Sequence, residues 1–146
     1  MNVRVMTIDD YDSLYGIWTT TAGMGLNNID DSRDGIGRYL ARNPHTCFVA
    51  EESGKIVGGI LCGHDGRRGM IHHTVVAEQS QRRGIGTALV AAALSALKAE
   101  RITKVLLVVF SRNEGGNAFW KKQGFTERTD LVYRNKLLTE LIRFDT

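Results

Sequence analysis

The sequence predicts a mixed α/β fold in which helices flank one central sheet. The chain has 146 residues, 42% hydrophobic and 24% charged, so it is long enough to bury a core and is neither disordered nor fibrous. Segments with the two-residue period of strands alternate with segments of helical period, and no linker or repeat separates them. Ten of the 16 glycines gather in three clusters, 58–69, 84–86 and 115–124, as expected where backbone approaches a ligand. We therefore expect a single ligand-binding domain over residues 1–146.

The N-terminal third is predicted to contain one strand and two helices. Residues 3–6 form the strand, and Thr7 caps the first helix. Ser32 or Asp31 begins the second helix, which ends before Pro44 because the residue preceding a proline disfavours helical geometry. The first helix has an apolar stripe at helical spacing, formed by Tyr11, Leu14, Tyr15 and Trp18.

The middle of the chain is predicted to form three strands and the longest helix. Residues 47–51 and 55–62 make a hairpin around a turn at Ser53 and Gly54. A glycine-rich loop leads to a strand over 70–77, and a helix then runs from Gly84 to about residue 100.

The C-terminal third is predicted to contain three strands and a short helix. Residues 104–110 are uniformly apolar at their centre, which is typical of a strand buried on both faces. The helix ends at Gln123, where Gly124 suits the left-handed position after a helix. Residues 125–127 and 131–135 are predicted to be two closing strands.

Charge and cysteine usage narrow the classes of partner. A net charge of +3 suits an anionic small ligand as well as a nucleic acid. The sequence lacks the interleaved basic and aromatic residues of a nucleic-acid binder, so we expect no nucleic-acid partner. Cys47 and Cys62 lack metal-ligand spacing, so we expect two buried thiols in a reducing compartment and no metal. Residues 1–7 lack a signal pattern and the apolar stretch 88–97 is too short for a bilayer, so we expect a cytoplasmic protein without a membrane partner.

The segment 75–87 is the most informative motif. An apolar strand ends there, a polar loop turns, and the long helix begins at Gly84 and Gly86. The first turn of a helix has unpaired N–H groups and a positive partial charge, and glycine leaves them accessible to a phosphate or pyrophosphate. A dinucleotide-binding fingerprint would need a further glycine at Leu89, and a Gly-Lys-Ser/Thr phosphate loop is absent.

Gln81-x-x-Gly84-x-Gly86 after an apolar strand resembles the acyl-CoA pyrophosphate loop of the GNAT N-acetyltransferase superfamily. A second family landmark is matched in register by Asn113, Gly116, Trp120, Gly124 and Phe125. The resemblance covers nearly the whole chain except residues 21–31 and the last dozen. It implies the GNAT acyl-CoA N-acyltransferase fold, with a mostly antiparallel sheet that splays between its fourth and fifth strands.

The resemblance also implies that acetyl-CoA is the acyl donor. The backbone of Thr74 and Val76 would pair with the pantetheine arm in the splayed gap, and amides from Gln81 to Thr87 would hold the pyrophosphate. Asn113 would bond to the pantetheine or the thiol. The side chains of Arg82, Arg83 and Lys122 would either lie near the CoA phosphates or be solvated. The residues predicted to bind the cofactor are Thr74, Val75, Val76, Gln81, Arg82, Arg83, Gly84, Ile85, Gly86, Thr87, Asn113, Phe119, Trp120 and Lys122.

Acetyl transfer to an amine needs a neutral nucleophile and a polarised thioester carbonyl. The backbone N–H of Val75 or Val76 is expected to polarise the carbonyl. Strand alternation places His72 on the face of Thr74 and Val76, and His73 on the other face. His72 also resembles a base histidine of the aralkylamine N-acetyltransferases. We predict His72 as the base, with a packing role as its alternative and His73 as the less favoured candidate.

The departing thiolate also needs a proton. Many family members use a tyrosine where this chain has Trp120, and indole is not a useful proton donor. Tyr133 is therefore the predicted acid, with Ser111 or water as alternatives. Trp120 is expected to form a packing wall beside the thioester.

The acceptor is expected to bind on the side of the first two helices. Asp30 and Asp31 would either attract a cationic amine or cap the second helix, and we favour the capping role. Asp65, in a glycine-rich loop, would either face the acceptor or belong to a turn. We predict acetylation of a primary amine on a small molecule, with a peptide N-terminus as an alternative. A catalytically inert acyl-CoA sensor remains the second class, because of Trp120. Apolar residues within 131–141 suit a homodimer.

Overall fold

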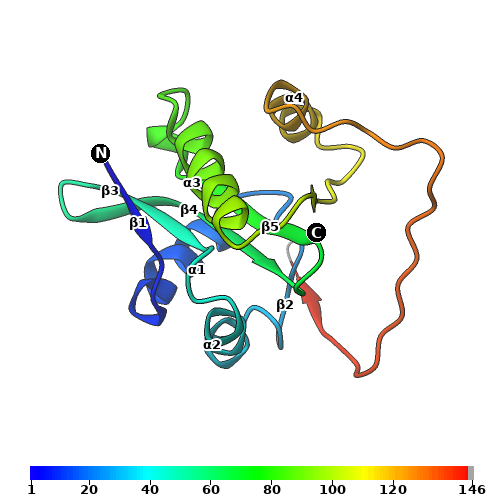
Figure 1. The fold of residues 1–146 in the computed structure, drawn as a ribbon. Helices are drawn as coiled ribbons and strands as arrows, with labels where there is room; N and C mark the ends of the chain where they lie inside the picture. Colours follow the sequence, from blue (N-terminus) through cyan, green and yellow to red (C-terminus); the bar gives the residue numbers. More distant parts are fainter. Residues whose placement is uncertain (145–146) are drawn as a thin grey trace.

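The computed structural model describes residues 1–144; of the domain predicted over 1–146, Asp145 and Thr146 lie outside the described residues. Its main sheet has the strand order β1-β3-β4-β5-β6, and β2 and β7 form a separate two-stranded sheet (Figure 1). The elements are β1 (Asn2–Val5), η1 (Ile8–Asp10), α1 (Tyr11–Thr19), β2 (Leu26–Asn27), α2 (Arg33–Arg42), β3 (Phe48–Glu52), β4 (Lys55–His64), β5 (Gly69–Val76), η2 (Glu78–Ser80), α3 (Ile85–Ala99), β6 (Val105–Leu106), α4 (Glu114–Lys122) and β7 (Arg143–Phe144).

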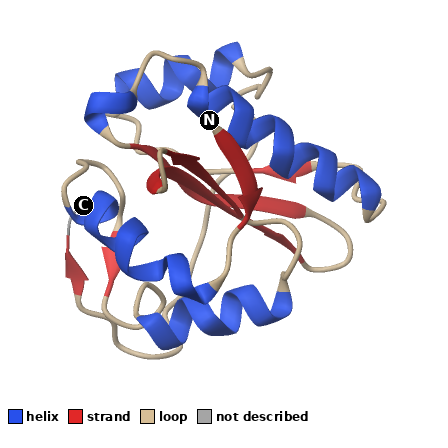
Figure 2. Ribbon diagram, turned by 90° about the vertical axis from the view of Figure 1, so that its left-hand side faces the viewer, coloured by secondary structure: helices blue, strands red, loops and turns tan. Residues whose placement is uncertain are grey.

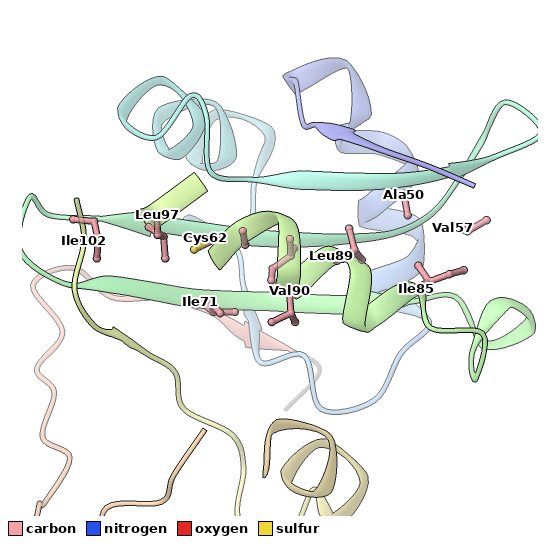
Figure 3. Close-up of a cluster of buried hydrophobic side chains, with 11 residues drawn as sticks. Ala50, Val57, Cys62, Ile71, Ile85, Leu89, Val90, Leu97 and Ile102 are labelled. Atoms are coloured by element: carbon pink, nitrogen blue, oxygen red, sulfur yellow. The ribbon is translucent and has the colours of Figure 1, made fainter. Parts of the chain in front are cut away.

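Helices cover both faces of the main sheet (Figure 2). On one face α3 packs Leu89, Val90 and Leu97 against β4 and β5, where Cys62 and Ile71 belong to the same buried cluster (Figure 3). On the other face α1 and α2 form a second buried cluster around Leu14, Trp18 and Ile36. None of the helices in residues 1–144 is both long and apolar enough to cross a membrane.

Local signals in the sequence correspond to the observed turns and caps. Ser53 and Gly54 both have positive φ, as the tight hairpin between β3 and β4 requires. Ser32 caps α2, because its hydroxyl accepts from the Gly35 N–H at 3.0 Å. Gly124 has φ +91° directly after α4, as predicted.

The sheet splays between β5 and β6. These strands pair in parallel, and the pairing extends only from Gly69↔Val105 to Met70↔Leu106. β5 continues to Val76 while pairing with β4 on its other side. The predicted splay between the strands over 70–77 and 104–110 is therefore confirmed.

Two predictions about the C-terminal third are wrong. Only Val105 and Leu106 of the segment 104–110 are in a strand, and Val108 is 58% exposed, because the divergence from β5 removes the partner that would cover the segment. Residues 125–127 and 131–135 form no strand; the second of these segments runs exposed along the outside of the molecule (Figure 1). The strand that the chain does form there is β7, which pairs with β2 and was not predicted.

Candidate active site

A cavity of about 1320 Å³ opens where β5 and β6 diverge. The end of β5, the loop before α3, and α4 all contribute to its lining. Arg83 is the one predicted cofactor residue that does not line it, since its guanidinium pairs with Glu52 instead. The predicted residues that line it are His72, Thr74, Val75, Val76, Gln81, Arg82, Gly84, Ile85, Gly86, Thr87, Asn113, Phe119, Trp120, Lys122 and Tyr133.

The register of β5 determines which backbone groups face this gap. The Ala77 N–H donates to the Val57 carbonyl at 2.8 Å, and Gly58↔Val76 is the next pair along the ladder. Hydrogen-bonded and non-hydrogen-bonded pairs alternate in an antiparallel ladder, so the polar groups of Thr74 and Val76 point away from β4 and into the gap. The backbone groups of Val75 point toward β4, which corrects the expectation that its N–H polarises a thioester.

The N-terminus of α3 is an open site for an anion. Gly84 precedes the helix with φ +81°; among residues 1–144 no side chain caps this end, and apart from the chain neighbours of Gly84 no atom lies within 4 Å of where its Cβ would be. The unpaired amides of the first turn and the helix dipole therefore face an accessible space. The Gln81 side chain lies next to it, where its Nε2 donates to the Val76 carbonyl at 3.0 Å.

Gly86 allows α4 to approach α3. A Cβ at this position would lie 3.2 Å from Cε1 of Phe119, which packs over the bare backbone. A second link joins the same two helices, because Gln123 Nε2 donates to Thr87 Oγ1 at 3.0 Å. Gly86 therefore makes room for the ring of Phe119, a role not predicted from the sequence.

α4 and its N-cap present four of the predicted residues to the cavity: Asn113, Phe119, Trp120 and Lys122. Asn113 caps the helix, with its Oδ1 accepting from the Gly116 N–H at 2.9 Å. Trp120 is packed edge-on between Phe119 and Phe125, at ring-centroid distances of 5.0 and 5.1 Å. Tyr133 lines the same cavity from the C-terminal segment, with 67% of its surface exposed.

A β-bulge changes the predicted faces of the two histidines. Ile60 pairs with Thr74 and Cys62 pairs with Ile71, so His72 and His73 together lie opposite Leu61. His72 packs against Tyr39 of α2 and His73 against Trp18 of α1, at ring-centroid distances of 5.5 and 5.0 Å. Both rings therefore face α1 and α2, and the alternation that placed His72 with Thr74 and Val76 is wrong at this point.

The two rings have different surroundings. His72 is exposed to the cavity space, yet the surrounding protein desolvates its charged form and, together with the neighbouring His73, lowers its pKa. His73 Nε2 lies 2.6 Å from Asp31 Oδ1, and only 14% and 6% of the two side chains are exposed. A neutral His72 therefore lies beside a nearly buried histidine–carboxylate pair.

Asp30 and Asp31 were favoured as caps of α2, and this is wrong for both. Ser32 takes that role, while Asp31 Oδ2 accepts from the Asn27 N–H at 2.8 Å and Oδ1 faces His73. No sequence signal could have revealed the pair, because its members are 42 residues apart. Asp65 belongs to its turn: its carboxylate accepts from the amides of Arg67 and Arg68, both at 2.8 Å.

A second cavity of about 480 Å³ lies against α2. Gly25, Asn27, His72 and His73 line both cavities, so the histidines mark where the two spaces meet. We refer to the smaller one as the α2 cavity. Its other lining residues are Asp30, Asp31, Gly35, Ile36, Arg38, Tyr39, Arg42 and Leu61.

Comparisons with known proteins found relatives of this chain by sequence and by structure. Residues 11–125 match the model of the acetyltransferase (GNAT) family. An acetyltransferase of Photorhabdus laumondii is 29% identical over 142 residues, which covers 96% of this chain and 98% of that protein. The crystal structure of Ard1 from Thermoplasma volcanium shares 26% identity at a TM-score of 0.77, covering 86% of this chain and 82% of that one. Rv2747 from Mycobacterium tuberculosis, solved with CoA, has the same fold at 23% identity and a TM-score of 0.71, covering 88% and 73%.

Proposed function

Because the chain belongs to the acetyltransferase (GNAT) family and acetyl-CoA is that family's acyl donor, we propose that it acetylates a primary amine on a small molecule. The observation that carries the proposal is the meeting of two cavities at His72 and His73. The larger cavity has room for acetyl-CoA along the open edge of β5, and the α2 cavity has the volume of a small-molecule site. We infer that the acceptor enters from the α2 side.

In this arrangement the donor lies along β5 and reaches α3. The outward backbone groups of Thr74 and the Val76 carbonyl pair with the pantetheine arm as an additional strand would, which leaves the Val76 N–H for the thioester carbonyl. The first-turn amides beyond Gly84 hold the pyrophosphate, and Arg82 and Lys122 add positive charge beside it. Arg83 is not retained, because it pairs with Glu52 outside the cavity.

The chemical step is direct attack of the amine on the thioester. The ammonium first loses a proton to His72, directly or through water, and the neutral nitrogen then forms the C–N bond as the C–S bond breaks. The Val76 N–H stabilises the negative charge that develops on the carbonyl oxygen. Tyr133 stays the proposed proton donor to the leaving thiolate.

A matched pair of variants tests the donor site. Gly84→Asp and Gly84→Asn have the same size, and both residues tolerate the left-handed backbone of this position better than other side chains do. The aspartate would repel a pyrophosphate, so we expect it to weaken acetyl-CoA binding by about tenfold or more relative to the asparagine variant. Calorimetric titration measures this ratio. Equal binding by the two variants would place the pyrophosphate elsewhere.

Release of free thiol from acetyl-CoA, measured with a panel of primary amines, tests the reaction. We expect amine-dependent release with at least one small amine. Tight binding of acetyl-CoA with no release for any small amine or peptide N-terminus would instead favour the inert sensor, to which Trp120 in place of the family tyrosine pointed.

We also propose that the protein forms a homodimer through its C-terminal segment. Leu131, Val132 and Leu138 are 63%, 77% and 95% exposed, and Val108 on the diverging segment after β6 is 58% exposed. A second copy would bury these apolar side chains from both sides.

A further inference from the structure

We propose that the α2 cavity selects primary amines that also carry an anionic group, a carboxylate or a phosphate, and discriminates against amines with a second positive charge. The inference rests on the proposed function, since it names the class of acceptor for the same reaction. It is based on two groups of charged side chains that line this cavity, one acidic and one basic.

The acidic stretch lies where the α2 cavity meets the larger one. Asp31 is nearly buried and faces His73, while Asp30 is exposed and accepts one hydrogen bond, from Asn27 Nδ2 at 3.0 Å. Neither carboxylate is paired with a lysine or arginine among residues 1–144. An ammonium group is therefore favoured at this end, beside His72.

The basic stretch is formed by α2 itself. Arg38 and Arg42 are one helical turn apart, line the cavity on either side of Tyr39, and are exposed. Neither guanidinium forms an ion pair in the part of the chain that the structure describes, whereas Arg33 at the start of the same helix pairs with Asp12. The two arginines thus leave their end of the cavity positively charged.

The spacing along α2 sets the length of a suitable acceptor. Gly35 lies against the backbone of Asp30 and so marks the acidic end. With a rise of about 1.5 Å per residue, Arg38 and Arg42 lie about 5 Å and about 10 Å further along the helix. A short amino acid or aminoalkyl phosphate can place its nitrogen near His72 and its anion near these arginines.

The charge distribution also excludes a class of acceptor. A diamine would have to place its second ammonium group beside the guanidinium groups of Arg38 and Arg42, and neighbouring positive charges repel each other. A neutral alkylamine avoids this repulsion but gains no partner for the guanidinium groups. We therefore expect the order of preference to be anionic amine, neutral amine, diamine.

Three amines with the same four-carbon chain test this order. The rates of thiol release are compared for γ-aminobutyrate, butylamine and putrescine, with phosphoethanolamine against ethanolamine to distinguish phosphate from carboxylate. We expect kcat/KM for the better anionic amine to exceed that of its neutral counterpart by about tenfold or more, because charge-assisted hydrogen bonds form only with the anion. Putrescine should react more slowly than butylamine.

Variants assign the preference to the cavity. Replacing both arginines (Arg38→Gln with Arg42→Gln) should raise KM for the anionic amine by about tenfold and leave butylamine within about twofold. Arg33→Gln, on the same helix but outside the cavity, is the control and should change neither. Equal turnover of anionic and neutral amines, or a preference for putrescine, overturns the inference while the acetyltransferase proposal stands. Absence of turnover with every amine would overturn the proposed function, and the inference with it.

Discussion

At the level of single residues, the β-bulge in β5 gives its two adjacent histidines, His72 and His73, different surroundings on the same face of the sheet. The bulge opposite Leu61 turns both rings to the same face, where His73 meets Asp31 at 2.6 Å and His72 remains open to the cavities. Desolvation by the surrounding protein, with a smaller contribution from the neighbouring His73, lowers the pKa of His72. This arrangement suits a base that must be neutral to accept a proton.

The lowered pKa of His72 predicts that kcat/KM falls at acid pH, which gives the pH–rate profile an acid limb. Because the folded protein keeps this ring neutral below the ordinary value of 6.5, kcat/KM should fall with a midpoint below that pH. We expect His72→Gln to lose about a hundredfold or more in kcat/KM and to lose this limb, while His45→Gln, at an exposed histidine, keeps both. An unchanged limb in His72→Gln would show that another group is the base.

The same group links pH to stability. The unfolded chain protonates His72 at about pH 6.5, whereas the folded chain does so only at lower pH. This contribution to stability is therefore fully present above pH 6.5 and is lost as the pH falls toward the folded pKa. Urea unfolding of wild type and His72→Gln between pH 5 and 8 should show the smaller acid sensitivity in the variant.

At the scale of elements, the site depends on where secondary structure ends. β5 continues past the last pair with β6, which leaves the backbone of Thr74 and Val76 open, and α3 begins at an uncapped glycine beside that edge. α4 then packs against the start of α3 through Phe119 over Gly86. The ends of three elements therefore gather at one cavity.

Asn113 tests whether a helix cap also contacts the donor. Asn113→Ala removes the bond to the Gly116 N–H and should lower the free energy of unfolding by about 1 kcal/mol. Asn113→Ser keeps a capping oxygen but has no amide to donate. We expect it to retain most of the stability in urea unfolding and to bind acetyl-CoA about fivefold more weakly in calorimetric titration. Wild-type binding by the serine variant would restrict Asn113 to capping.

At the scale of the whole molecule, the segment from residue 126 to 141 is the least integrated part. All its residues but Leu141 are exposed, and directly after it the Ile142 N–H donates to Asn28 Oδ1 at 2.7 Å and β7 pairs with β2. An apolar segment in this position is available to a second copy of the chain. The reducing, cytoplasmic location inferred from the cysteines, both of which are buried free thiols, stays a prediction.

The dimer proposal is tested by light scattering after size-exclusion chromatography. We expect wild type to have the mass of a dimer at micromolar concentration. Leu131→Glu combined with Leu138→Glu should shift the mass toward the monomer, because burying a carboxylate at an apolar contact is unfavourable. Lys136→Glu, an exposed polar position in the same segment, is the control. A monomeric wild type would contradict the proposal.

Features that depend on neighbours a few residues apart could be predicted from the sequence alone. The alternating periods predicted the order of the main strands and helices, Ser32 and Gly124 marked helix ends, and the glycines before α3 predicted the family. Such signals are readable because a cap, a turn or a period acts within about one or two turns of chain.

Features that join distant segments could be recognised only in the folded molecule. The bulge at the histidines depends on the register against β4, Asp31 reaches His73 across 42 residues, and β7 pairs with a strand more than a hundred residues earlier. For the same reason the strand predicted over 104–110 is limited to Val105–Leu106, and those predicted over 125–127 and 131–135 are absent, since a strand exists only where another backbone pairs with it. Apolar sequence makes such pairing favourable but does not provide the partner.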